Sequence, residues 1–204
     1  MLPRPAGERS LGFIELCSLA RGVVCADAMV KTAPVRLIMM TPVSAGRMLV
    51  AVDGGVAPVE AAIARGMDVA GEQLHDALFL ADLHPDVPAA LLPDSARAVT
   101  EAVGLVETAT AAAAIRAADA GLKAANVKLI RLRLAYGING KGFLQLTGKV
   151  AAVEAGVEAA AAAVDIPEFL LGREVIPAVH EDVRHWLGRR LREDDPPFDP
   201  VPGV

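Results

Sequence analysis

Hydrophobic positions in the first half of the chain switch regularly between a two-residue and a helical period. Alternating or continuous apolar runs of five to eight residues indicate strands, and apolar residues three or four apart indicate helices. The resulting order is β-α-β-β-α-β followed by a short helix. The predicted elements cover residues 12–18, 20–32, 35–40, 47–52, 58–70, 77–83 and 87–91.

The second half of the chain repeats this order, and the residues repeat with it. Gly12–Ile38 aligns without a gap on Gly104–Ile130, with eleven identical pairs that include Glu15 with Glu107. A repeat of this length indicates a duplicated domain, because two copies of a shorter motif could not cover each other's apolar faces. The predicted elements cover residues 104–108, 109–125, 127–135, 142–147, 150–164, 169–176 and 181–192.

The order of elements predicts an α/β (α+β) fold with two tandem ferredoxin-like domains. Each domain is expected to hold a four-stranded, mainly antiparallel sheet with its helices packed on one face, around a core of its own. The expected boundaries are an N-terminal extension at 1–11, a first domain at 12–92, a linker at 93–103, a second domain at 104–187, and a helix end with a flexible Pro-rich tail at 188–204.

Composition narrows the function classes. The 204 residues are 53% hydrophobic but only 3% aromatic, with a net charge of −5, so neither base stacking nor attraction to phosphate is expected and nucleic acid is excluded as a partner. No uncharged apolar stretch reaches the roughly 18 residues of a membrane span. The mean hydropathy of +0.41 therefore predicts extensive burial, in a core or between subunits.

The residues that carry enzyme and metal chemistry are few and scattered. With four His and two Cys, and with His180 and His185 five residues apart, we predict no metal site and no cofactor. No nucleophile, base and acid come together in either copy, so an enzyme is not expected. Glu15 and Glu107 recur at matching positions, as do Asp27 and Asp119, and this recurrence indicates an architectural role.

Two pairs of recurring features are more specific. Lys31 and Lys123 each follow an Asp by four residues near the end of the first helix of their copy, a spacing that an ordinary ion pair within a helix also explains. A loop of small residues ends in Gly and a basic residue in both copies. The loop residues are Ser44, Ala45 and Gly46 in the first copy and Ile138, Asn139 and Gly140 in the second.

The recurring motifs resemble the bacterial microcompartment (BMC) shell domain. The resemblance rests on Gly-Phe-Ile-Glu-Leu at 12–16, Ala-Asp-Ala-Met-Val-Lys at 26–31, the small-residue loop, Val-Glu-Ala at 59–61 and a closing Ile-Pro-x-x-His at 176–180. Two such domains in series are similar to the tandem, trimer-forming class of shell proteins. The segments 81–85 and 175–177 resemble the non-permuted, propanediol-utilisation type.

The resemblance implies a structural subunit of a microcompartment shell in the cytoplasm. Three chains would form a flat pseudo-hexameric tile that joins other shell proteins edge to edge, with Lys31 and Lys123 at the tile edge. Ser44, Ala45 and Gly46 would alternate with Ile138, Asn139 and Gly140 around a central pore for small metabolites. The alternative class is a soluble trimeric ferredoxin-like protein that binds a ligand or regulates, in a cleft between subunits.

Two positions depart from the family pattern. Some tandem shell proteins carry a Cys in the first pore loop, where three copies hold an iron–sulfur cluster, whereas this chain has Ser44. A hydroxyl does not replace a thiolate as a cluster ligand, so no cluster is expected. The closing segment of the second copy reads Pro177-Ala178-Val179-His180 and lacks the family's Arg, so the affinity or geometry of edge packing is expected to differ.

Overall fold

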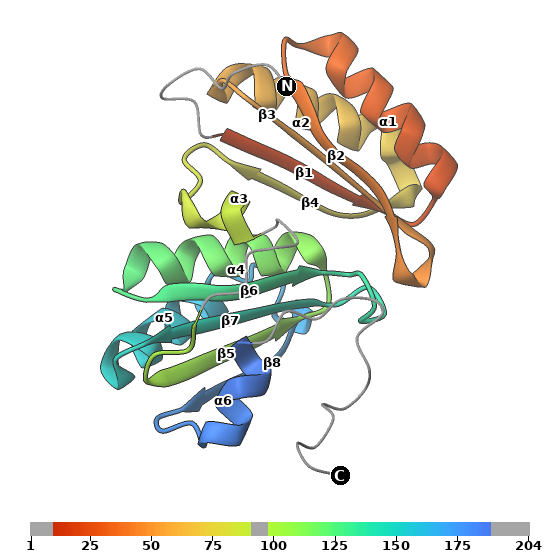
Figure 1. The fold of residues 1–204 in the computed structure, drawn as a ribbon. Helices are drawn as coiled ribbons and strands as arrows, with labels where there is room; N and C mark the ends of the chain where they lie inside the picture. The colour runs from red at the N-terminus through yellow and green to blue at the C-terminus, as the bar shows by residue number, and fades with distance from the viewer. Residues whose placement is uncertain (1–9, 91–97, 189–204) are drawn as a thin grey trace.

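The computed structural model describes residues 10–90 and 98–188, and it holds two four-stranded sheets with all neighbouring strands antiparallel (Figure 1). The strand orders are β2-β3-β1-β4 and β6-β7-β5-β8, so the two domains have the same topology. This arrangement confirms the predicted α/β class with two tandem ferredoxin-like domains. Residues 1–9 of the predicted N-terminal extension, residues 91–97 at the end of the predicted first domain and the start of the predicted linker, and residues 189–204 of the predicted helix end and tail lie outside the described residues.

The elements follow the predicted order closely. In the first domain they are β1 Ser10–Leu16, α1 Leu19–Thr32, β2 Arg36–Val43, β3 Arg47–Gly54, α2 Val56–Ala70, β4 Leu74–Leu80 and α3 Asp86–Ala90. In the second they are β5 Ala102–Thr108, α4 Ala111–Ala124, β6 Lys128–Leu134, β7 Gly142–Gly148, α5 Val150–Ala162, β8 Leu170–Ile176 and α6 Glu181–Gly188. Short 3-10 turns lie at Ser44–Gly46, Gly71–Gln73 and Pro167–Phe169.

Strand β2 is longer than the sequence predicted. It continues through Pro42 to Val43, where the pattern indicated a loop from residue 42. Proline interrupts a strand only where its missing N–H would have been paired, and β2 is an edge strand of the first sheet. The loop between β2 and β3 is therefore reduced to Ser44–Gly46.

Glycine at the start of β1 and of β5 allows a helix to lie close to each sheet. A Cβ atom on Gly12 would lie 2.5 Å from Ile63 Cγ1 of α2, and one on Gly104 would lie 2.4 Å from Val157 Cγ2 of α5. Both distances are too short for real carbon atoms. The recurrence of these glycines thus has a packing reason, the same in both domains.

The hydrophobic core is not divided by domain, contrary to the expectation that each copy folds around its own core. One cluster, which includes Ile14, Met29 and Ile63, lies between the first sheet and its helices. The largest cluster instead joins residues of the first sheet, such as Phe13 and Leu78, to helix α4 and the second domain. Helix α4 packs on its own sheet and also against β1 and β4, so it lies between the two sheets (Figure 1).

Candidate functional site

The two loops that the sequence singled out lie against each other. Ser44–Gly46 connects β2 to β3, and residues 135–141 connect β6 to β7. The Gly137 amide donates a hydrogen bond of 3.0 Å to Ser44 Oγ across the two domains. The structure therefore brings together two segments that are far apart in the chain.

The loop residues differ in exposure. Ala45, Gly46 and Asn139 are exposed, Ser44 and Ile138 are half-buried, and Gly140 is buried. Both loops turn through left-handed backbone, with φ of +66° at Ala45 and +53° at Asn139. These turns reverse the chain within a few residues and keep the loop tips small.

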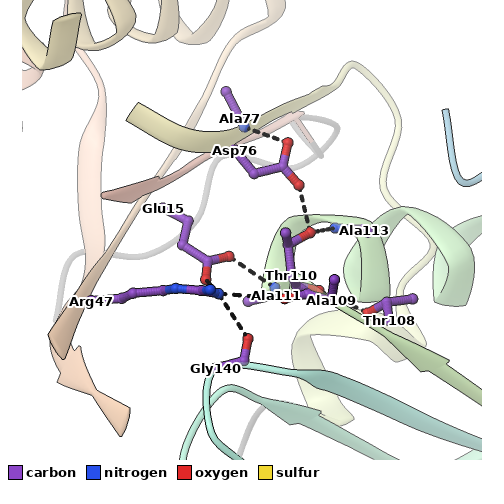
Figure 2. Close-up of polar contacts among 10 residues, drawn as sticks. All are labelled: Glu15, Arg47, Asp76, Ala77, Thr108, Ala109, Thr110, Ala111, Ala113 and Gly140. Atoms are coloured by element: carbon purple, nitrogen blue, oxygen red, sulfur yellow. Dashed lines mark hydrogen bonds and ion pairs between the residues drawn. The ribbon is translucent and has the colours of Figure 1, made fainter. Parts of the chain in front are cut away.

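A buried ion pair lies next to the loops, at the contact between the domains (Figure 2). Arg47 Nη1 of β3 donates to Glu15 Oε1 of β1 over 2.8 Å, and the Glu15 side chain is 0% exposed. The same nitrogen lies 3.2 Å from the Gly140 carbonyl oxygen and 3.4 Å from that of Ala109. Arg47 thus connects the first sheet to two segments of the second domain.

Glu15 also holds the start of helix α4. Its Oε2 accepts a hydrogen bond of 2.9 Å from the Ala111 amide, the first residue of that helix. A carboxylate is stabilised there by the unpaired N–H groups and by the helix dipole. Burial raises the pKa of Glu15, and the hydrogen bonds from Arg47 and from the Ala111 amide act in the opposite direction.

A second carboxylate supports the same helix end. Thr110 caps α4 by accepting from the Ala113 amide at 3.1 Å, and its hydroxyl donates to Asp76 of β4 (Figure 2). Asp76 was not singled out by the sequence, because nothing in the second copy repeats it: Gly172 lies opposite Glu107 as Asp76 lies opposite Glu15. The start of α4 is therefore fixed by two side chains of the first sheet.

The two lysines with the recurring spacing occupy different environments. Lys31 pairs with Asp27 at 2.7 Å and its side chain is 72% exposed. Lys123 pairs with Asp119 at 2.7 Å and also donates to the Asp82 carbonyl of the first domain. Both form the ion pair that the spacing indicated, but Lys123 in addition links the domains.

The described residues hold no candidate metal site and no helix that could span a membrane. In the ranges 10–90 and 98–188, no three His, Cys, Asp or Glu side chains gather as metal ligands would. In the same ranges, no helix combines the length and the apolar character needed to cross a bilayer. Cys25 is buried and Cys17 is exposed. The candidate site is therefore the contact between the domains together with the two loops beside it.

Substitution of Gly140 tests how firmly Arg47 is held. Gly140 has φ of +80°, and an added Cβ would lie 2.9 Å from Arg47 Nη1; Gly46 has φ of +70° with open space around it. Gly46→Ala is expected to cost about 1–2 kcal/mol from backbone strain alone. Gly140→Ala is expected to cost clearly more, because it also displaces Arg47. Urea unfolding measures the free energy of unfolding of both variants. An equal loss in both would mean that Arg47 moves aside at no cost.

Comparisons with known proteins identify relatives of both domains. The family model of the BMC domain matches twice, at residues 10–83 and 102–179. The bacterial microcompartment shell protein PduT of Citrobacter freundii is 38% identical over 176 residues, covering 86% of this chain and 96% of that protein. The shell protein PduA of Salmonella typhimurium is 39% identical over 95 residues, covering 46% of this chain and 97% of that protein.

A solved structure agrees with these relatives. A microcompartment protein from Desulfitobacterium hafniense superposes with a TM-score of 0.76 at 36% sequence identity. The alignment covers 86% of this chain and 98% of that one. The likeness therefore extends over both domains and their arrangement in series.

Proposed function

This chain belongs to the BMC-domain family of bacterial microcompartment shell proteins, and from this premise we propose that three copies close into a pseudo-hexameric tile with a central pore. Its role is that of a structural subunit of the microcompartment shell. The relatives are structural shell proteins, and we extend this to the chain by proposing that it performs no catalysis.

One observation carries the proposed trimer: α4 buries a face that its counterpart α1 leaves exposed. Ile115 of α4 is 0% exposed, whereas Val23 at the matching position of α1 is 48% exposed. The first sheet packs against α4, and the described residues contain no sheet that packs in this way against α1. The matching buried and exposed residues are Ala111 and Leu19, Ile115 and Val23, and Leu122 and Val30.

The second sheet carries the matching polar groups. Lys141 and Glu107 form an ion pair of 2.6 Å at the positions of Arg47 and Glu15. The Glu107 side chain is 40% exposed, against 0% for Glu15. A second chain that places the start of its α1 there would supply the Leu19 amide to Glu107, as the Ala111 amide is supplied to Glu15.

These two faces support a closed ring. The second sheet of one chain and α1 of the next repeat the contact that the first sheet makes with α4 inside each chain. Such a head-to-tail contact closes into a ring when its rotation divides a full turn. Three chains of two domains give six similar contacts, half within chains and half between them.

The loops beside the contact support the proposed pore. Because the loops lie next to the domain contact, all six loops of a trimer would meet around one axis. The pore would be lined by Ser44, Ala45 and Gly46 alternating with Ile138, Asn139 and Gly140. The lining is uncharged and rich in backbone polar groups, which suits the passage of small polar metabolites.

Electron microscopy of concentrated protein tests the proposed tile. Flat, hexagonally packed sheets are expected, because tiles of this shape join edge to edge with one another and with other shell proteins. Discrete particles that never assemble, even at low ionic strength, would contradict the proposal.

The proposed edge role of the lysines has its own test. Lys31→Glu combined with Lys123→Glu is expected to abolish sheets in electron micrographs while trimers persist. The exposed ion pair of Lys31 with Asp27 contributes only about 0–1 kcal/mol, and circular dichroism checks that the chain also stays folded without the partly buried pair of Lys123 with Asp119. The sedimentation coefficient reports the trimer separately. If the double variant forms sheets as extensive as those of the unsubstituted chain, neither lysine takes part in contacts at the tile edge.

A further inference from the structure

Helix α3 of the first domain completes the helix layer of the second. It packs against strand β6 and helix α4, and Val87 in its first turn is 0% exposed. Val87 belongs to the same core cluster as Leu129 and Leu132 of β6, which are 0% and 6% exposed. A short helix thus covers an edge strand of the neighbouring domain.

The matching edge strand of the first domain, β2, packs against α1 but exposes apolar residues where β6 is covered by α3. Leu37 and Met40 of β2 correspond to Leu129 and Leu132 of β6, and they are 39% and 44% exposed. The strand partners confirm the correspondence, since Met40 lies opposite Val50 and Leu132 opposite Leu144. In the described part of the chain, α3 has no counterpart over β2.

Helix α6 is the counterpart of α3. In both, a His imidazole accepts from the amide two residues on: Asp86 N donates to His84 Nδ1 at 3.2 Å, and Asp182 N to His180 Nδ1 at 3.3 Å. The same turn therefore begins both helices, and Val183 occupies the place of Val87. Val183 is 46% exposed.

We propose that α6 of one chain packs against β2 of the next chain, inserting Val183 over Leu37 and Met40 as Val87 is inserted over β6. The occupant is a second copy of this chain, so the inference rests on the proposed trimer. The apolar residues exposed on α6 and on β2 are then two halves of one contact, which removes both from water.

Polar groups at the base of α3 support this contact. Within the chain, the His84 amide donates to Asp119 Oδ1 at 2.7 Å, and Lys123 donates to the Asp82 carbonyl, so α4 holds the turn before α3. Helix α1 presents Asp27 and Lys31 at the matching positions. Asp27 would hold the turn before α6 of the adjoining chain by accepting from its His180 amide, as Asp119 accepts from the His84 amide.

Chemical cross-linking tests the contact directly. A chain with Val183→Cys and Met40→Cys is treated with a short bismaleimide, after Cys17 and Cys25 are replaced by Ala, the residue that the second copy has at both matching positions. Covalent dimers and trimers are expected on a denaturing gel. The control combines Val183→Cys with Val56→Cys on α2. Equal cross-linking of both pairs, or none of the first pair in intact trimers, would overturn the inference.

Charge insertion gives an independent measurement. Val183→Asp is expected to weaken association at least about tenfold in sedimentation equilibrium, because the carboxylate would be buried against apolar side chains. Met67→Asp on α2, where Met67 is 41% exposed, is the control and should associate as the unsubstituted chain does. If the unsubstituted chain forms no trimer, the proposed function fails. If it forms trimers and Val183→Asp does not weaken them, only the α6 contact fails.

Discussion

Replacing Glu15 by Ala is expected to lower the free energy of unfolding by about 3–5 kcal/mol, the typical cost of removing one partner from a buried ion pair. The substitution would leave the largely buried Arg47 without its carboxylate partner and the Ala111 amide without its acceptor. Urea unfolding followed by circular dichroism measures the loss.

Two further variants separate charge from structure in that experiment. Glu15→Gln keeps an oxygen that can accept from the Ala111 amide, so it is expected to cost less than Glu15→Ala. Glu60→Ala, on the exposed face of α2, is expected to change stability by less than about 0.5 kcal/mol. A Glu15→Ala variant as stable as Glu60→Ala would mean that the ion pair does not hold the domains together.

Replacing Val23 by Asp is expected to abolish the trimer while each chain stays folded. In the proposed contact between chains, Val23 is buried as its counterpart Ile115 is buried within the chain, where Ile115 is 0% exposed. The new carboxylate would therefore be buried without a partner. We expect the affinity of each contact between chains to fall at least about 100-fold, which corresponds to about 2.8 kcal/mol. Sedimentation equilibrium measures the association, and circular dichroism reports the fold.

Val56→Asp is the matched control for this variant. Val56 is 51% exposed on α2, close to the 48% of Val23, but it lies outside both faces assigned to the ring. The control should form trimers like the unsubstituted chain. Trimers that survive Val23→Asp would show that α1 is not buried between chains.

The sequence allowed the fold to be predicted because each local pattern occurs twice. The recurrence of Gly12 as Gly104 and of Glu15 as Glu107 identified positions with a structural duty. What those residues contact could not be predicted, since Glu15 reaches the Ala111 amide across almost half of the chain. Periodicity describes the face of an element and not its distant partner.

The core cluster shared by the two domains had one signal in the sequence that the prediction did not use. Helix α4 begins with four alanines at 111–114, where α1 has Leu-Ala-Arg-Gly at 19–22, with larger side chains at two of the four positions. Small side chains on successive positions suit a helix enclosed between two sheets, because they let both sheets approach. Asp76 and Thr110 had no comparable signal, since their contact exists in one copy alone.

The most direct measurement of the proposed assembly is a structure of the native particle by electron cryo-microscopy. Three chains around one axis are expected, with α1 of each chain on the second sheet of the next and the Leu19 amide at the Glu107 carboxylate. A particle of any size in which the outer face of α1 remains exposed to solvent would contradict the proposal.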